Sequence, residues 1–587
     1  MTIESWFPRW RSWLVALLAL ASSLVGIVNW FTYDDRYVIE LNPMTRHLND
    51  WYRVFATSYW PKEWGGDGYR PLTILAFKIE SVIGGGIPSI FHATNILLYV
   101  VASLLVFWVA RRMLPTWAAW FAAAAFAVHP VHVEAVANVV GQSELLVAIA
   151  TLAALLLYLR DRLAGPLRPA TAACITLLYA IACFSKEHGV VLIAVLGAAE
   201  LTVLADDTPL IERVRSLRLF YLVLALVAVS FVAVRSLVLS DHSLGGFQPF
   251  TPFSTLHISS RDRVLTAVGV VPQWIRLLYW PARLSSEYGP PQIEIAQGLS
   301  LTQLPGFTLL IGILALGILL RRRRPVTAFG IAFTVIAILP SSNFLVPAGI
   351  VLAERTLFLA SAGAMLILGD VVLLVAEWLQ RSGADAARSR RYVLAARAAC
   401  AALLVTGAVR SSLRTRVWKD GDTLFHQAVL DAPDAYRAHF MLGAWAFYEK
   451  RLREGEVEYL KALKLFPYDP FLAYSLAEQY KTVGLCHAAV PMYQWAFNLD
   501  STFNVGHTSL AWCLLNERRY DEARTAAIDA FRYGAEIPRL RRIMFLADSA
   551  KAADMAKEKT KVVSQAGGAS KLPESMQKTG RPSPTHE

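Results

Sequence analysis

The sequence predicts an all-α protein in two parts, a polytopic membrane domain followed by an α-solenoid. Of its 587 residues, 55% are hydrophobic and only 17% are charged, and the mean hydropathy is +0.41, which is too apolar for a soluble chain of this length. Apolar runs long enough to cross about 30 Å of hydrocarbon recur as far as residue 410. Beyond residue 411 the composition is that of a soluble protein, and a period of 34 residues appears.

The first part contains about eleven predicted transmembrane helices. Residues 264–281 are also apolar, but Pro272 and Arg276 interrupt them, so we predict an interfacial or re-entrant segment there. The first run ends in small residues and resembles a cleaved signal peptide, yet its length favours a membrane span. The predicted spans are residues 12–30, 90–110, 116–133, 139–160, 170–185, 189–205, 218–239, 304–320, 326–340, 356–376 and 392–410.

Basic residues predict the orientation of these spans. The formal net charge is +12, but Arg and Lys lie mainly in short clusters between apolar runs, which is typical of membrane topology rather than nucleic-acid binding. If the N-terminus with Arg9 and Arg11 is cytoplasmic, every second loop should be basic, and this alternation holds to the end. It predicts that the C-terminal part is external, either periplasmic or lumenal. The basic loops contain Arg111 and Arg112; Arg160, Arg162 and Arg168; Arg213, Arg215 and Arg218; Arg321 to Arg324; and Arg388, Arg390 and Arg391.

The 34-residue period predicts paired helices in the second part. Small residues recur at fixed offsets, for example in Leu442-Gly443, Leu476-Ala477 and Leu510-Ala511, and they allow two helices to approach closely. This spacing resembles the tetratricopeptide repeat. The predicted repeats are residues 436–469, 470–503 and 504–537.

These patterns divide the chain into three regions. We predict a membrane-embedded domain over residues 1–411, an external repeat domain over 412–545 and a disordered tail rich in Lys, Ser, Gly and Pro over 546–587. The five cysteines include no CxxC pair, and they predict neither a disulfide framework nor a zinc site. They are Cys174, Cys183, Cys400, Cys486 and Cys513.

Ionisable residues gather at the predicted outer ends of the spans, where such groups are costly and therefore functional candidates. Asp34 and Asp35 follow the first span directly, although an exposed acidic loop is the simpler interpretation. His129, His132 and Glu134 suggest a metal site, but Pro130 interrupts the helix, so a polar-ligand contact or a structural loop is favoured. Further candidates are Arg70, Lys186, Glu287, Glu354 and Arg355, for which ion pairs, snorkelling or loop anchoring are the alternatives.

The order of these motifs resembles the transmembrane and tetratricopeptide-repeat O-mannosyltransferases, membrane glycosyltransferases of the GT-C fold. The motifs are "YDD", "YRPLT", "FAVHPVHVEAVANVVGQSELL", "SKEHG", "WPARLSSEY" and "LPSSNFLVPAGIVLAER", followed by the repeats, and the likeness reaches about residue 540. It implies a GT-C-type domain that moves a sugar, mannose in this family, from a polyprenyl-phosphate donor to a protein hydroxyl on the outer membrane face. Animal members carry many more repeats, so the resemblance implies a short, bacterial-type member with an open choice of acceptor.

The resemblance also suggests roles for the candidate residues. Inverting transfer needs a general base, and Asp34 is the expected one. Asp35 is the expected second catalytic residue, which either tunes Asp34 by like-charge proximity or binds the sugar. Arg355, with Arg70 and Lys186 behind it, is expected to bind the donor phosphate as negative charge develops on it. His129, His132, Glu134, Glu287 and Glu354 are expected sugar or acceptor contacts. We expect no cofactor, and a divalent metal is the less favoured alternative. Expected partners are the lipid-linked donor, membrane lipid, and an acceptor or partner protein on the repeats.

Three other functions compete with this hypothesis. A polymerase or ligase of lipid-linked glycans should hold its key residues in a large late external loop, but the longest candidate, 240–263, has few acidic residues. A non-enzymatic scaffold that presents repeats does not explain the gathered outer-face charges. A transporter should show paired broken spans, and none is apparent.

Overall fold

The computed structural model describes residues 12–61, 68–204, 208–240, 253, 258–381, 386–500, 506–532 and 537–568. All regular elements in these ranges are α-, 3₁₀- or π-helices, which confirms the predicted all-α fold. The chain forms two compact units, Met1–Asp469 and Pro470–Glu587.

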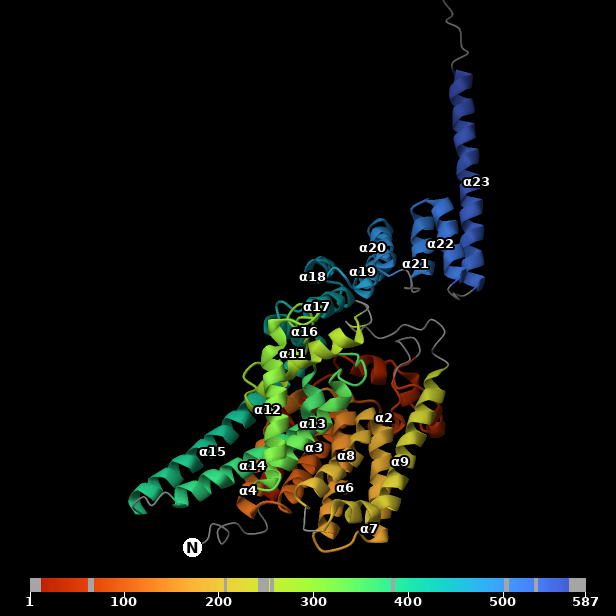
Figure 1. The fold of residues 1–587 in the computed structure, drawn as a ribbon. Helices are drawn as coiled ribbons and strands as arrows, with labels where there is room; N and C mark the ends of the chain where they lie inside the picture. Colours follow the sequence, from red (N-terminus) through yellow and green to blue (C-terminus); the bar gives the residue numbers. More distant parts are fainter. Residues whose placement is uncertain are drawn as a thin grey trace, which may run out of the picture. The chain divides into compact units, whose positions relative to one another are not determined.

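Each predicted span overlaps a helix of the first unit. α3 packs on α6 and α13 packs on α14 in the bundle of Figure 1. Within the described residues, six helices are long and apolar enough to cross a membrane, or seven if one bent pair counts as a span, so this is a multi-pass membrane protein. The count of eleven stays a prediction. The helices that match predicted spans are α1 (Ser12–Ser23), α3 (Pro88–Ala110), α4 (Thr116–Ala127), α6 (Gln142–Arg162), α7 (Pro169–Ser185), α8 (Leu192–Leu201), α9 (Leu210–Ser240), α12 (Leu304–Leu320), α13 (Pro325–Ile338), α14 (Phe358–Arg381) and α15 (Ala386–Thr415).

The third predicted span is bent at its His-Pro motif. α4 and the segment Pro130–Ala137, which contains η8 (Pro130–His132) and α5 (Val133–Ala137), meet at 47°. Pro130 has no N–H to donate and disfavours helical geometry in His129, whose backbone is extended (φ −73°, ψ 121°). The bend places α5 at the end of the bundle.

Two helices lie beside the spans. α11 (Ser260–Tyr279) covers the segment predicted to be interfacial or re-entrant, and it is not among the helices apolar enough to cross a membrane. α2 (Pro71–Gly84) was not predicted. It begins with a proline, which fits the first turn, and it ends at Gly85 in the left-handed conformation (φ 61°).

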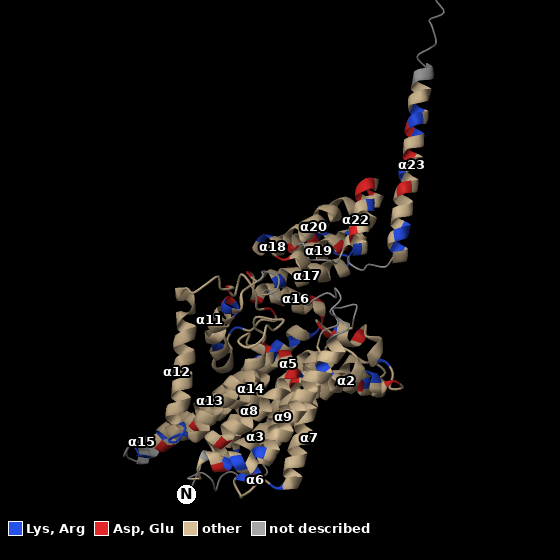
Figure 2. Cartoon of the chain, turned by 45° about the vertical axis from the view of Figure 1, so that its right-hand side comes forward, with Lys and Arg blue, Asp and Glu red and all other residues tan. Residues whose placement is uncertain are grey.

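Charges separate the two ends of the bundle. α3, α6 and α12 each end at arginines, and Figure 2 shows basic segments at the end of the bundle opposite α5. Acidic and basic segments are mixed around α5 and α2. The end of the bundle at α5 contains Glu134, one of the candidate residues.

Each predicted repeat contains two of the helices that follow α15. α16 (Gly421–Asp431) leads to α17 (Tyr436–Tyr448) and α18 (Leu452–Leu465), where a Cβ on Gly443 would lie 3.1 Å from the Gly455 carbonyl oxygen, so the small residues do allow close packing. The second unit contains α19 (Pro470–Thr482), α20 (Cys486–Leu499), α21 (His507–Asn516) and α22 (Tyr520–Arg532). The first predicted repeat thus falls in the first unit. The boundaries at 411 and 545 and the solenoid stay predictions.

Two expectations differ from the structure in the second unit. Cys486 and Cys513 form a disulfide that the sequence did not predict, because their 27-residue separation matches no motif and only the stacking of α20 on α21 brings them together. α23 (Ile537–Gly568) continues as a helix through much of the predicted disordered tail, since Ala, Lys, Glu and Met in that stretch all favour helix. Residues 569–587 lie outside the described residues.

We predict that Gly363→Ala destabilises the bundle by about 1–3 kcal/mol, because overpacking forces two helices apart. A Cβ at Gly363 would lie 2.6 Å from the Gly330 carbonyl oxygen. The matched control is Gly312→Ala in α12, where a Cβ meets nothing within 4 Å. Thermal melting in detergent should show a lower Tm for the first variant only, and equal Tm values would contradict this account of the α13–α14 contact.

Candidate active site

Asp34 lies in a tight turn between the end of the first span and a short π-helix, η4 (Arg36–Glu40). Tyr33, just before it, has φ 54°, which costs a bulky residue about 1–3 kcal/mol. The ring of Tyr33 packs near Trp418 and Phe425, with centroids 6.4 and 6.2 Å away. The surrounding structure therefore holds the turn in an unfavourable conformation, as is common at functional sites.

Asp35 has a different environment from Asp34. Its side chain is completely buried and accepts hydrogen bonds from the backbone N–H groups of Thr32 (3.3 Å), Val139 (3.1 Å) and Val140 (2.8 Å). Burial raises the pKa of the Asp35 carboxyl to about 8, although these three hydrogen bonds oppose the shift. Asp35 thus fastens the turn to η9 (Val139–Gly141), and its oxygens face backbone amides.

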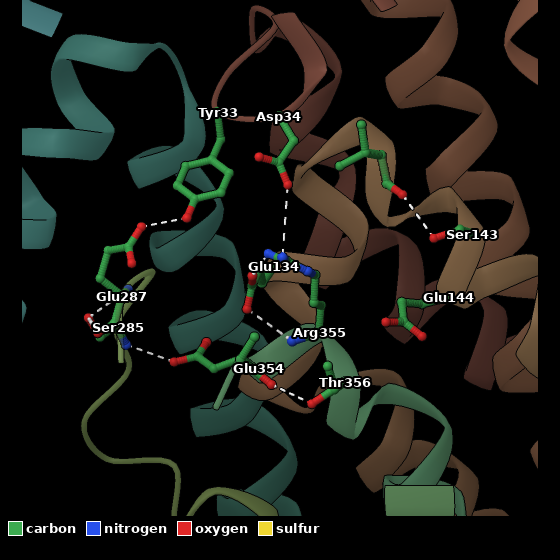
Figure 3. A network of polar contacts seen from close by, with 12 residues as sticks. Tyr33, Asp34, Glu134, Ser143, Glu144, Ser285, Glu287, Glu354, Arg355 and Thr356 are labelled. Atoms are coloured by element: carbon green, nitrogen blue, oxygen red, sulfur yellow. Dashed lines mark hydrogen bonds and ion pairs between the residues drawn. The ribbon is translucent and has the colours of Figure 1, made fainter. Parts of the chain in front are cut away.

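Arg355 lies between two carboxylates, as Figure 3 shows. It belongs to η13 (Glu354–Leu357); its guanidinium pairs with Glu134, and its backbone N–H donates to the other oxygen of Glu134 at 2.9 Å. A second guanidinium nitrogen lies 3.8 Å from the Asp34 carboxylate, which is an ion pair but too long for a hydrogen bond. Glu134 therefore fixes the position of Arg355 beside Asp34.

Asp34 keeps some access to solvent, with 23% of its side chain exposed against 17% for Arg355. Burial raises the pKa of the Asp34 carboxyl above its ordinary value, Arg355 lowers it, and Glu287 raises it again. A carboxylate with a raised pKa is a stronger base. The Asp34 carboxylate is thus both accessible to solvent and more basic than usual, whereas the Asp35 carboxylate is not accessible to solvent.

The other two expected phosphate ligands are also paired. Arg70 donates to Glu187 at 3.1 Å and lies over the ring of Tyr59, 4.5 Å from its centroid. Lys186 is buried and pairs with Glu144 of α6. Burial lowers the pKa of Lys186, and the positive charges of Arg70 and Arg355 lower it further, so the three cations act on one another.

Glu287 and Glu354 both belong to the network in Figure 3, and both are buried. Glu287 accepts from the Tyr33 hydroxyl at 2.5 Å and from Arg437 Nε at 3.0 Å. Glu354 accepts from the Ser285 backbone N–H at 2.7 Å and holds the loop that carries Glu287. Their expected contact with sugar or acceptor stays a prediction, but their visible partners are protein groups.

His129 and His132 face the helix bundle rather than Asp34. His129 Nε2 lies 3.0 Å from the Leu278 carbonyl oxygen, and its Nδ1 accepts from the Val131 N–H at 3.3 Å. His132 lies between Tyr99 (3.1 Å) and Ser361 (2.7 Å). Both side chains are buried with satisfied nitrogens, so the structure assigns them core contacts, and the bend at Pro130 is the reason.

The sequence did not single out Tyr33 or Arg437. Tyr33 adjoins the aspartate pair, but nothing marks it except that position, and Arg437 lies within a predicted repeat. Only the fold brings Arg437 to Glu287. In the part of the chain that the structure describes, no three His, Cys, Asp or Glu side chains converge in a geometry suited to a metal ion.

Comparisons with known proteins relate this chain to an enzyme class. No protein-family model matches the chain. Protein O-mannosyl-transferase TMTC3 of Mus musculus is 26% identical over 518 residues, which are 82% of this chain and 54% of that protein. TMTC1 of Homo sapiens is 24% identical over 503 residues (77% and 55%), and Tmtc2 of Drosophila melanogaster is 42% identical over 136 residues (22% and 14%). The curated relatives of this chain are protein O-mannosyl-transferases.

This result confirms the resemblance predicted from the motifs. The chain spans about half the length of the curated relatives that it matches over most of its own length. Among solved structures, the oligosaccharyltransferase of Archaeoglobus fulgidus is 17% identical and aligns with a TM-score of 0.37 over 70% of this chain and 57% of that one, a likeness too distant to carry an argument.

We predict that Asp35→Asn lowers the stability of the full chain by about 1–3 kcal/mol, because the Asn amide group would face backbone N–H donors that need an acceptor. Asp34→Asn is the matched control, since Asp34 is partly exposed. Thermal melting should give a lower Tm for Asp35→Asn and a nearly unchanged Tm for Asp34→Asn. Equal Tm values would show that Asp35 does not anchor the turn.

Proposed function

We propose that this protein is a GT-C-type membrane glycosyltransferase that moves a sugar, mannose by analogy with its relatives, from a polyprenyl-phosphate donor to a hydroxyl of a protein acceptor. The observation that carries the proposal is the pairing of Asp34 with Arg355, a partly exposed carboxylate and a guanidinium 3.8 Å apart. Inverting transfer from a phosphate donor needs a base for the acceptor hydroxyl and positive charge for the leaving phosphate, and the site offers both. The names of the curated relatives support the same reaction class.

In the proposed reaction, Asp34 takes the proton of the acceptor hydroxyl as its oxygen attacks the anomeric carbon. A new carbon–oxygen bond forms on one face of the sugar, and the bond to the phosphate breaks on the other face, which inverts the configuration. The electron pair leaves with the polyprenyl phosphate. Arg355 stabilises that charge, because a guanidinium offers several N–H donors to phosphate oxygens.

Arg70 and Lys186 have supporting roles in this scheme. Each is already paired with a carboxylate, Glu187 and Glu144 respectively. They add positive potential around the phosphate site rather than a free ligand position, because a group held in an ion pair exchanges partners only at a cost. Asp35 acts by holding Asp34, and Glu134 acts by holding Arg355.

We further propose that the site and the repeats are external. The first repeat and Asp34 share one compact unit, and α17 lies beside the turn that carries Asp34. The Cys486–Cys513 disulfide favours an oxidising compartment. The arginine clusters at the other end of the bundle favour a cytoplasmic location for that end.

The activity test uses the purified full chain in lipid nanodiscs with radiolabelled polyprenyl-phosphate sugars. We expect transfer to periplasmic proteins, and we expect Asp34→Asn to lower kcat by about 100-fold or more, because it removes the base. Asp521→Asn, which changes a largely exposed carboxylate on α22, is the matched control. Equal transfer by wild type and Asp34→Asn would remove Asp34 as the base. Transfer only to lipid-linked glycan would instead favour a polymerase or ligase.

The orientation has its own test. In a background without the three free cysteines, Lys557→Cys places a thiol on α23, where the native side chain is 81% exposed. We expect a membrane-impermeant maleimide to label it in intact spheroplasts. Arg322→Cys, in the basic segment after α12, should be labelled only after permeabilisation. The reverse pattern would contradict the external location of the repeats.

A further inference from the structure

A chain of polar contacts joins the first repeat to the turn that carries Asp34. Arg437, in the first turn of α17, donates from Nε to Glu287 at 3.0 Å, and the other oxygen of Glu287 accepts from the Tyr33 hydroxyl at 2.5 Å. Glu287 is buried, with 5% of its side chain exposed. Tyr33 directly precedes Asp34. One side chain of the repeat thus reaches the candidate base through two intermediates.

Other contacts from the same region lie on both sides of Asp34. The Trp30 N–H donates to the Lys419 carbonyl oxygen at 2.7 Å. The Arg36 guanidinium lies 3.8 Å from the ring centroid of Tyr448, at the end of α17. The turn is therefore held before and after Asp34 by residues that follow α15.

An apolar cluster supports the same arrangement. It joins α5 to α16 and α17, and α5 also carries Glu134, which fixes Arg355. The elements that hold the base and the elements that hold the guanidinium thus rest on one core. The buried members of the cluster are Val133, Ala137, Trp418, Leu424, Phe425 and Leu442.

A small cavity adjoins this chain of contacts. It has a volume of about 30 Å³, which is enough for one or two water molecules. It is lined by Tyr33, Glu287, Arg355 and Arg437 together with residues 349–353. The first repeat thus contributes Arg437 to the wall of this cavity.

We propose that the first repeat is part of the catalytic unit, and that Arg437 is a positioning residue that sets the geometry of Asp34 through Glu287 and Tyr33. This inference rests on the proposed function, because it assigns Asp34 as the base. It gives the repeats two different roles. The repeat at 436–469 completes the active site, and residues 470–587 form a separate unit.

The charges around Asp34 supply a test that separates positioning from general support. Four charged groups shift the pKa of the Asp34 carboxyl, namely Arg355, Glu287, Arg437 and Glu134. The charge of Asp34 in turn raises the pKa of Tyr33, Asp35, Tyr37 and Tyr59. Glu287 raises the pKa of Asp34 and Arg437 lowers it. Neutralising Glu287 should therefore lower the pKa of Asp34, and neutralising Arg437 should raise it.

The experiment measures kcat/KM against pH for the full chain and for Arg437→Gln and Glu287→Gln. We expect the acid limb to move to higher pH for Arg437→Gln and to lower pH for Glu287→Gln, each by about one pH unit or less. Arg437→Lys should keep the wild-type acid limb but lower kcat, because it keeps the charge and loses the fork geometry. Arg453→Gln, on the exposed face of α18, should match wild type.

A second measurement does not depend on turnover. Tyr33→Phe and Arg437→Gln, alone and together, form a double-mutant cycle on the Tm of the full chain. Non-additive Tm shifts are expected, because both variants break one contact chain. The positioning role would be overturned if Arg437→Gln and Glu287→Gln kept the wild-type pH profile and kcat, or if their acid limbs moved in the same direction. Additive Tm shifts in the double-mutant cycle would overturn it as well. An inactive wild type with non-additive Tm shifts would refute the proposed reaction and leave the contact chain standing.

Discussion

Charges at the end of a membrane bundle are stable only when each has a partner, and Arg355 meets this constraint for the whole site. Its guanidinium is paired with the buried Glu134 and faces Asp34 at 3.8 Å. Without Glu134, a partly buried cation would lack its main counter-charge, which is strongly destabilising. Without Arg355, the carboxylates of Asp34 and Glu134 would repel each other. Glu134 is thus the structural partner of Arg355, and Arg355 in turn separates the charges of Glu134 and Asp34.

The same constraint applies to the other two cations proposed at the phosphate site. Arg70 and Lys186 are held by Glu187 and Glu144, so the positive charge needed for a phosphate is present but compensated. In the proposed reaction, the lipid phosphate takes over part of these interactions. Binding of the donor is therefore expected to change the ion pairs around Asp34, and this would link the basicity of Asp34 to the presence of the leaving group.

The position of the first repeat changes how the domains are understood. A membrane catalyst with an attached binding module would place its boundary at residue 411, where the composition changes. The chain instead divides into its two compact units after residue 469. Trp418 and Phe425 pack on Tyr33, and Arg437 bonds to Glu287, so these residues belong to the first unit. The break in composition marks the end of the membrane spans, and the break in packing lies one repeat later.

The sequence by itself determined the all-α class and the positions of the apolar helices, because hydropathy is a local pattern that does not depend on packing. It also marked Asp34 as a candidate. It also located Arg355 and Glu134 as candidates. Only the tertiary structure separated Asp34 from Asp35, since the two differ in burial and not in residue type. The tertiary structure also showed that His129 and His132 are buried in the core, because the chain bends at Pro130. It also brought Arg437 to Glu287, 150 residues away in sequence, which no local pattern records.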